Sequence, residues 1–209
     1  MKAVMISIKP KWCGLIASGK KTLEIRKTQP KLKPPFKCYI YCTNEKKLKF
    51  WTNKRYSYAD NHSHNLFDRC GNGKVIGEFV CDTMVVDKTY GHDSMFREMA
   101  CMSQVEAASY CLNANMYGWH ISELKIYDEP KPLYDFYKPG ALSEYDLDDN
   151  LCNYCVDTEH GKYRMVGSPD GPLMCEGRFC GAAYQEYLDE EFQITRPPQS
   201  WCYVEEDNR

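Results

Sequence analysis

Residues 19–27 read GKKTLEIRK, and this stretch decides the fold prediction. A glycine turn leads into a strand that carries Lys21, Glu24 and Arg26. Because successive side chains of a strand point to opposite faces, Glu24 and Arg26 are expected on one face, where they can form an ion pair. Lys21 would enter the same region from the turn. The purely structural alternative is a surface Glu–Arg pair that only stabilises the turn.

The segments around this stretch alternate between strand and helix patterns. Ser103 and Glu106 stand three residues apart at the start of a helical pattern, which is the capping-box arrangement. Residues 44–73 are expected to form a long polar loop between two strands. The predicted helices are 11–19, 103–113 and about 181–192, and the predicted strands are 3–10, 20–27, 37–43, 74–86, 116–128 and 196–206.

Composition excludes several classes of protein. The chain has 209 residues, of which 43% are hydrophobic and 27% charged, and this is ordinary globular usage. No uninterrupted apolar run approaches the roughly 20 residues that a membrane-spanning helix needs, so no membrane partner is expected. Lys9 interrupts the apolar run that a signal peptide requires. These features predict a cytoplasmic protein.

Basic residues are concentrated at one end of the chain. Residues 1–55 contain 15 Lys and Arg against 2 Asp and Glu, whereas residues 135–209 contain 6 against 16. Such a local positive field attracts phosphate backbones, although a solvated basic face is the plain alternative. A cationic rim with one aromatic side chain would suit RNA. Its candidate residues are Lys9, Lys11, Trp12, Lys20 and Lys27, beside Lys21 and Arg26.

Twelve cysteines without a secretory signal indicate thiols and metal ligands rather than disulfides. Eight of them are scattered, and Cys38 and Cys42 alternate with Ile40 as one buried face of a strand would. The other four form a C-x2-C pair and a C-x4-C pair separated by nineteen residues. These are Cys152, Cys155, Cys175 and Cys180.

The four clustered cysteines predict a structural zinc ion. Two close thiolate pairs match the tetrahedral coordination of Zn²⁺, and a turn-rich segment gains folding energy from such a metal. His160 lies between the pairs as a substitute ligand. Reduced, partly buried thiols are the alternative, and a redox centre is disfavoured because no thioredoxin-like pattern surrounds the pair. His62, His64 and Cys70 are more simply a coincidence in a polar loop.

Five segments in order resemble the ASCH domain, a relative of the PUA fold, and are most similar to its phage and bacterial branch. They are ISIKPKW (6–12), GKKTLEIRK (19–27), GKVIGEF (73–79), GWHIS (118–122) and PPQSWCYV (197–204). The resemblance implies an α+β fold, a PUA-like β-barrel with flanking helices, over residues 1–137 and 195–209. Residues 138–194 are then a small zinc-ribbon-like insertion, and the protein is expected in the cytoplasm of a bacterial or phage-infected cell.

The resemblance also implies a cleft in which Lys21, Glu24 and Arg26 face RNA or a modified nucleoside. His120, Ser200 and Trp201 lie on strands similar to the walls of that cleft, so they join the candidate nucleic-acid-binding residues. Taken by themselves, a strand tryptophan is more often a core residue than a platform for a base, and a lone strand histidine is more often a structural residue than an acid–base group.

Two other function classes remain open. One ASCH branch hydrolyses the amide of N4-acylated cytidine with a Lys, a Thr and a Glu; Lys21 matches that lysine, and Glu24 stands at the position of the threonine. Lys21 and Glu24 would then act as nucleophile and proton carrier, or Lys21 and Arg26 would stabilise a pentavalent phosphate during RNA cleavage. The third class is a phage protein that inhibits a protein partner, and the acidic insertion is a candidate for protein contact.

Overall fold

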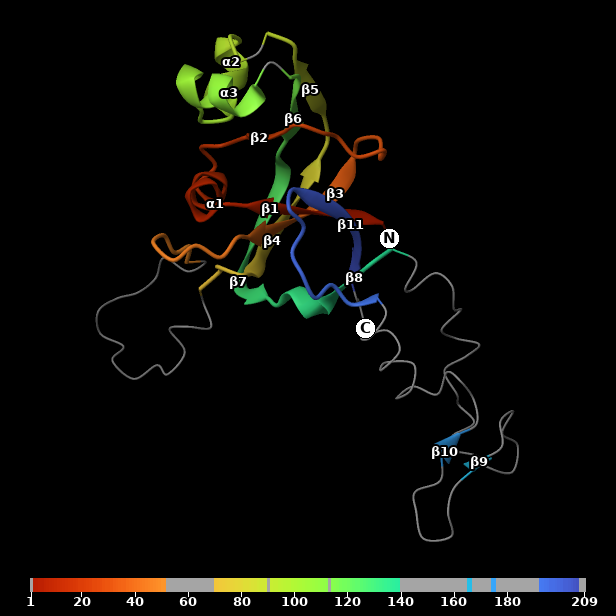
Figure 1. Ribbon diagram of the computed structural model, residues 1–209. Helices are drawn as coiled ribbons and strands as arrows, with labels where there is room; N and C mark the ends of the chain where they lie inside the picture. The colour runs from red at the N-terminus through yellow and green to blue at the C-terminus, as the bar shows by residue number, and fades with distance from the viewer. Residues whose placement is uncertain are drawn as a thin grey trace, which may run out of the picture. The chain divides into compact units, whose positions relative to one another are not determined.

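The computed structural model describes residues 2–51, 70–89, 91–112, 114–139, 165–166, 174–175 and 192–206 (Figure 1). The chain divides into two compact units. The larger comprises Ala3–Leu133 and Arg196–Tyr203, and the smaller comprises Met1–Lys2, Tyr134–Thr195 and Val204–Arg209. The sequence-based boundary between a barrel and an insertion at residues 137–138 stays a prediction.

The main sheet is mixed and has the strand order β7-β4-β3-β1-β11-β8. Strand β1 pairs parallel with β3, whereas β3 with β4, β4 with β7 and β11 with β8 pair antiparallel. Every residue of β1 is buried, as expected for a central strand that is covered on both faces. The strands are β1 (Ala3–Ile8), β3 (Phe36–Cys42), β4 (Lys74–Cys81), β7 (Ser122–Lys131), β8 (Phe136–Tyr137) and β11 (Trp201–Glu206).

A second, antiparallel sheet has the order β2-β6-β5 and carries the decisive motif. Its strands are β2 (Leu23–Arg26), β5 (Met84–Asp87) and β6 (Met116–His120). Glu24 lies opposite Trp119 and Arg26 lies opposite Tyr117. Since directly opposed residues share a face of a sheet, the two charged side chains of β2 lie on the Trp119 side.

The two sheets curl around one shared core as a half-barrel with few helices. The core cluster includes Val4 and Ile6 of β1, Ile40 of β3, Phe79 of β4 and Trp119 of β6, and each of these is at most 1% exposed. This arrangement is consistent with the coarse part of the fold prediction, an α+β fold with a β-barrel and flanking helices. The predicted zinc ribbon lies largely outside the described residues.

Three helices lie in the described part of the larger unit. They are α1 (Pro10–Ala17), α2 (Ser94–Met99) and α3 (Gln104–Cys111). Helix α1 starts at a proline, whose missing N–H is not needed at the first helical position. Phe96 of α2 and Ala107 of α3 pack with Leu23 and Ile25, the residues of β2 that alternate with Glu24 and Arg26. Strand β2 is therefore covered on both faces.

The capping box predicted for α3 is confirmed. The Ser103 side chain accepts a hydrogen bond from the backbone N–H of Glu106 at 3.2 Å, and the Glu106 carboxylate accepts one from the backbone N–H of Ser103 at 2.9 Å. These bonds satisfy two of the N–H groups that a helix start leaves open.

Three predicted strands were wrong in length. The 74–86 stretch breaks into β4 and β5, and the 116–128 stretch breaks into β6 and β7; in each case the two pieces belong to different sheets. The alternating pattern continues through such a bend, so the sequence does not reveal it. The final strand starts at Trp201 rather than at residue 196, because Pro197 and Pro198 have no N–H to donate to a ladder.

The smaller unit is described in short pieces. A single turn of 3-10 helix, η1 (Leu133–Asp135), leads towards β8, where Tyr137 and Phe136 pair with Glu205 and Glu206. Strands β9 (Met165–Val166) and β10 (Met174–Cys175) form an antiparallel pair. The predicted helix around 181–192 lies outside the described residues apart from its last position. Within the described ranges, no helix is both long and apolar enough to span a membrane.

Gly77 of β4 provides a test of the main sheet. A Cβ at Gly77 would overlap the backbone oxygen of Lys125 and lie 3.0 Å from the Cα of Ile126, both in β7. Backbone atoms cannot rotate away, so Gly77→Ala is expected to lower the free energy of unfolding by about 2 kcal/mol or more in urea denaturation. Gly14→Ala in α1 is the matched control, because nothing lies within 4 Å of its added Cβ. Equal stability of the Gly77→Ala variant and the wild type would contradict the close β4–β7 packing.

Glu106 predicts a pH dependence of stability. Its hydrogen bond from the Ser103 backbone, followed by the contact with Lys11, lowers the pKa of Glu106 to about 2. A carboxylate with a lowered folded-state pKa stabilises the protein above its unfolded-state pKa, and that contribution disappears as the pH falls towards 2. Glu106→Gln should therefore be less stable than the wild type at pH 7, and this difference should narrow below about pH 4.5 in thermal unfolding. The control Glu98→Gln changes an exposed carboxylate of α2 and should not reproduce this pattern. A stability difference between wild type and Glu106→Gln that stays constant with pH would contradict the assignment.

Candidate functional site

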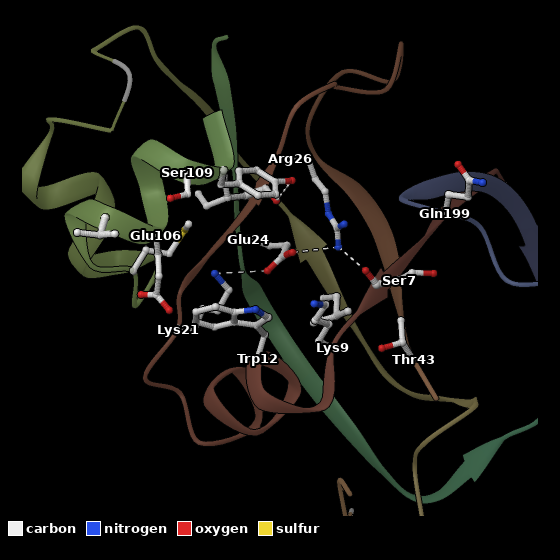
Figure 2. Close-up of a pocket in the computed structure, with 15 residues that line it drawn as sticks. Ser7, Lys9, Trp12, Lys21, Glu24, Arg26, Thr43, Glu106, Ser109 and Gln199 are labelled. Carbon is white, nitrogen blue, oxygen red and sulfur yellow. Dashed lines mark hydrogen bonds and ion pairs between the residues drawn. The ribbon is translucent and has the colours of Figure 1, made fainter. Parts of the chain in front are cut away.

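A cavity of about 550 Å³ lies beside β2 in the larger unit (Figure 2). Its walls come from the end of β1, the start of α1, strand β2 and helix α3, with Thr43 after β3 and Gln199 before β11. This volume is in the range of pockets that hold small ligands. Of the fifteen residues that line it, Lys9, Trp12, Lys21, Glu24 and Arg26 had been predicted as site residues.

Lys21, Glu24 and Arg26 form a continuous chain of charges in the cavity wall. The Nη2 atom of Arg26 lies 3.0 Å from Oε1 of Glu24, and Nζ of Lys21 lies 3.4 Å from Oε2. The three residues are only 3%, 6% and 8% exposed, in sequence order. The alternation predicted for β2 is therefore seen, and the pair is buried rather than a surface Glu–Arg pair.

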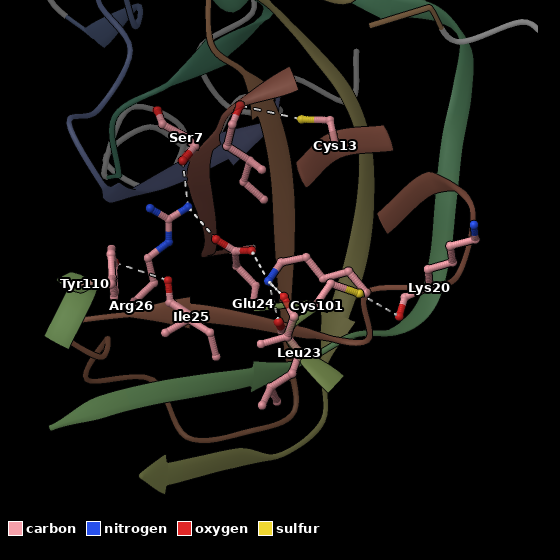
Figure 3. Close-up of polar contacts among 12 residues, drawn as sticks. Ser7, Cys13, Lys20, Leu23, Glu24, Ile25, Arg26, Cys101 and Tyr110 are labelled. Carbon is pink, nitrogen blue, oxygen red and sulfur yellow. Dashed lines mark hydrogen bonds and ion pairs between the residues drawn. The ribbon is translucent and has the colours of Figure 1, made fainter. Parts of the chain in front are cut away.

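The ammonium group of Lys21 is surrounded by acceptors. Its Nζ donates to the backbone oxygens of Leu23 and Ala100, both at 2.8 Å, in addition to its contact with Glu24 (Figure 3). An ammonium has three N–H donors, and three acceptors are within reach here. The same Nζ lies 5.1 Å from the ring centroid of Trp12. These contacts fix Lys21 between the turn before β2 and the end of α2.

The guanidinium group of Arg26 joins β2 to β1. Its Nη2 donates to the backbone oxygen of Ser7 at 2.6 Å, beside its contact with Glu24 (Figure 3). Its Nε is buried and has no hydrogen-bond partner within the described part of the chain. The hydroxyl oxygen of Thr43 is likewise buried and has no partner among the described residues. The described part of the cavity wall thus combines a lysine and a carboxylate that have protein partners with two buried polar atoms that have none.

Two aromatic rings flank this chain. Trp12 of α1 is half-buried, and the Nζ of Lys11 lies 4.3 Å from its ring centroid. Tyr110 of α3 donates its hydroxyl to the backbone oxygen of Ile25 at 3.3 Å. Burial raises the pKa of Tyr110, so the side chain is a neutral phenol at physiological pH. Both rings can offer apolar surface to a ligand.

An ion pair connects the helices on the two sides of the cavity. Nζ of Lys11 on α1 lies 3.1 Å from Oε1 of Glu106 on α3. Both side chains are well exposed, so this contact contributes little to stability. It does neutralise a carboxylate that lines the cavity, which leaves the lining with an excess of positive charge from Lys9, Lys21 and Arg26 over Glu24.

Six other predicted binding residues do not line the cavity. One of them is Lys11, described above. Lys27 is exposed, and its Nζ lies 5.2 Å from the Tyr110 ring centroid. Lys20 is exposed, and its backbone oxygen accepts from the thiol of Cys101 at 3.2 Å. Ser200 and Trp201 lie at the start of β11, where the backbone oxygen of Ser200 accepts from Ser7.

Trp201 and His120 have structural contacts. Trp201 packs against the core with its ring centroid 6.0 Å from that of Trp119, and its Nε1 donates to the Thr28 hydroxyl at 3.0 Å. Nδ1 of His120 lies 2.6 Å from the Asp82 carboxylate. The hydrogen bond from His120 lowers the pKa of Asp82. His120 is thus half-exposed beside the β4–β5 turn, away from the cavity lining.

The clustered cysteines lie outside the described residues except for Cys175, which ends β10. His160, His62 and His64 also lie outside them. Among the described residues, no group of three or more His, Cys, Asp or Glu side chains could hold a metal ion. The zinc prediction is therefore neither supported nor opposed by the described part of the chain.

Several cavity residues were missed by the sequence analysis. Ser7 and Thr43 sit at strand ends, and Met102, Ser109 and Tyr110 come from a helical segment whose capping was predicted but whose position was not. For Ser109 and Tyr110, the available sequence signal was the predicted helix 103–113 that contains them. The approach of α3 to β2 is a tertiary contact between segments some 85 residues apart, as in the hydrogen bond from Tyr110 to Ile25.

Comparisons with known proteins return structural likenesses alone. No protein-family model matches the sequence, and no curated protein matches it. One similar solved structure is a tyrosine-to-phenylalanine mutant of ZmASCH from Zymomonas mobilis, which is 15% identical, with 92% of this chain and 100% of that chain covered and a TM-score of 0.42. Another is ASCH from Zymomonas mobilis, which is also 15% identical, with 91% of this chain and 96% of that chain covered and a TM-score of 0.40. Both are structures of the ASCH domain, the family that the sequence motifs resemble. At this level of similarity, the function of the site has to be inferred from its own residues.

Proposed function

We propose that the cavity binds a base of single-stranded RNA or a modified nucleoside. The observation that carries this proposal is the buried Lys21–Glu24–Arg26 chain in the wall of a cavity that has an aromatic ring on each side. The cavity volume of about 550 Å³ accommodates a molecule of nucleoside size.

Burial of three charges supports a functional role for them. Removing charged groups from water costs several kcal/mol per ion, and well-packed apolar residues often serve stability equally well. Buried charge networks that line a cleft are therefore candidates for ligand recognition. In this cavity the network has one carboxylate and two cations, all less than 10% exposed.

The chemistry of the wall suits a nucleobase. Each oxygen of Glu24 faces one cation but has a further lone pair that can accept a hydrogen bond from a base amino or ring N–H group. Trp12 and Tyr110 provide surfaces on which a flat ring can stack, as single-stranded bases do on aromatic side chains. The concentration of basic residues in 1–55 adds a field that attracts the RNA backbone.

Binding is favoured over hydrolysis by the contacts of Lys21. A nucleophilic lysine must present a free amine to its substrate, whereas Nζ of Lys21 already donates to two backbone oxygens and contacts Glu24. Attack on a substrate would have to break these bonds. Lys21 is accordingly interpreted as a group that holds Glu24 in position.

Trp12 gives the direct test of base binding. Trp12→Ala is expected to weaken the binding of single-stranded RNA oligonucleotides or of ribonucleosides, N4-acetylcytidine included, by about tenfold or more, because stacking contributes about 1–3 kcal/mol per base. Isothermal titration calorimetry would measure the affinities at two salt concentrations. Trp51→Ala is the matched control, since Trp51 is an exposed tryptophan outside the cavity lining.

Two outcomes would contradict this proposal. One is the absence of binding by the wild type to every oligonucleotide and nucleoside in the series. The other is turnover: release of acetate from N4-acetylcytidine, or cleavage of the RNA, by the wild type would favour the hydrolase alternative. The expected result is that the wild-type protein binds the base and shows no turnover of either substrate.

We also propose that the clustered cysteines bind one structural zinc ion. The support is their two-pair spacing, together with the β9–β10 pair, which ends at Cys175. Metal analysis of the purified protein should find about one zinc per chain, and Cys152→Ser should reduce the zinc content and the thermal stability. Cys202→Ser is the control, since Cys202 lies in β11 outside the cluster. Metal-free wild-type protein that is folded would overturn this proposal.

A further inference from the structure

We propose that the junction of β1 and α1 is a phosphate subsite of the cavity, so that the ligand is a nucleotide rather than a bare nucleoside. This inference rests on the proposed base-binding function and adds a second recognition element to the same cavity. The residues that would contact the phosphate are Lys9, Arg26 and Thr43, beside the N-terminus of α1.

Three consecutive residues bring the subsite together. The backbone oxygen of Ser7 accepts from Arg26 at 2.6 Å, and the backbone oxygen of Ile8 accepts from the backbone N–H of Thr43 at 2.8 Å. Lys9 follows directly as the N-cap of α1. Arg26, Thr43 and the helix start are thus tied to one short stretch of backbone, and all three of Lys9, Arg26 and Thr43 line the cavity (Figure 2).

Two polar atoms at this end have unmet hydrogen-bonding capacity. The Nε of Arg26 and the hydroxyl oxygen of Thr43 are buried without a partner in the described part of the chain. Arg26 is 8% exposed, and its Nη2 is already engaged by Ser7 and Glu24, so the guanidinium cannot turn to satisfy Nε elsewhere. An unmet buried donor is costly, and Nε can only be satisfied by an acceptor. An anionic oxygen of a ligand would supply that acceptor.

The start of α1 favours the same kind of ligand. Its N-cap makes no side-chain hydrogen bond and its first turn has no acidic residue, so no group of α1 itself offsets the positive end of the helix dipole. A helix N-terminus of this kind is suited to phosphate when other groups also face the anion. Lys9 is exposed at the cavity and adds a formal positive charge.

The charge distribution distinguishes the two ends of the cavity. Glu24 carries the carboxylate that suits a base edge, and the lining carboxylate of Glu106 is paired with Lys11 at 3.1 Å on the α3 side. Neither Lys9 nor Thr43 has a carboxylate partner in the contacts described above. A nucleotide placed with its base between Trp12 and Tyr110 would therefore direct its phosphate towards Lys9 and Thr43.

The test compares each ribonucleoside with its 5′- and 3′-monophosphates by isothermal titration calorimetry. For the base that binds best, one monophosphate should bind about tenfold or more tighter than the nucleoside, because charge-assisted hydrogen bonds to the phosphate are added. The gain should fall as the salt concentration rises. Inorganic phosphate should compete with the monophosphate and not with the nucleoside.

Three variants test which residues cause the gain in affinity from the phosphate. Thr43→Val removes the hydroxyl at nearly constant shape, and Lys9→Met removes the ammonium. Each should reduce several-fold the gain from the phosphate, measured as the ratio of the nucleoside and monophosphate dissociation constants of the same variant. Thr43→Ser, which keeps the hydroxyl, should retain the gain. Lys20→Met is the charge control, since Lys20 is an exposed lysine that does not line the cavity.

The failures are distinguishable. Equal affinity for nucleoside and monophosphates would overturn the phosphate subsite and leave the base-binding proposal intact. A gain that survives both Thr43→Val and Lys9→Met would also overturn it, because the phosphate would then lie elsewhere. Absence of binding to nucleosides, monophosphates and single-stranded RNA alike would overturn the proposed function and, with it, this inference.

Discussion

A carboxylate that is 6% exposed must be compensated, and the compensation of Glu24 shapes the whole cavity wall. Its two oxygens are met by Lys21 and Arg26, whose remaining donors reach Ala100 before α3 and Ser7 on β1. One charge network therefore joins strand β2 to the main sheet on one side and to the helical segment on the other. Removing one member would leave uncompensated charge in the interior, which is strongly destabilising.

The burial of β2 on both faces explains why these charges can be held so closely. Leu23 and Ile25 pack under α2 and α3, while Glu24 and Arg26 face the cavity, so the strand cannot rotate to expose its polar side. The ion pair of Lys11 and Glu106 is exposed and contributes less to stability, because water competes for both groups. Rigidity in the cavity thus comes from the β2 wall, and the rim between α1 and α3 is held weakly.

Sequence patterns predicted the local parts of this arrangement. The alternation of Glu24 and Arg26 and the capping box at Ser103 each depend on residues within one element, and both are present. The hydrogen bond from Arg26 to Ser7 and the pairing of Lys11 with Glu106 join residues 19 and 95 positions apart, and no local period encodes them. The bends after β4 and β6 escaped prediction for a related reason, because curvature of a sheet does not interrupt alternation.

The distribution of satisfied and unsatisfied polar atoms has a consequence for recognition. The ammonium of Lys21 and the carboxylate of Glu24 are held by protein partners before any ligand arrives, whereas Nε of Arg26 and the hydroxyl of Thr43 are not. A ligand that satisfies the second pair need not disturb the first. Binding would then leave the contacts of Lys21 and Glu24 intact, and preorganisation of this kind is what allows a small polar contact to contribute to affinity. The network that stabilises β2 would in this way also keep the recognition atoms in fixed positions.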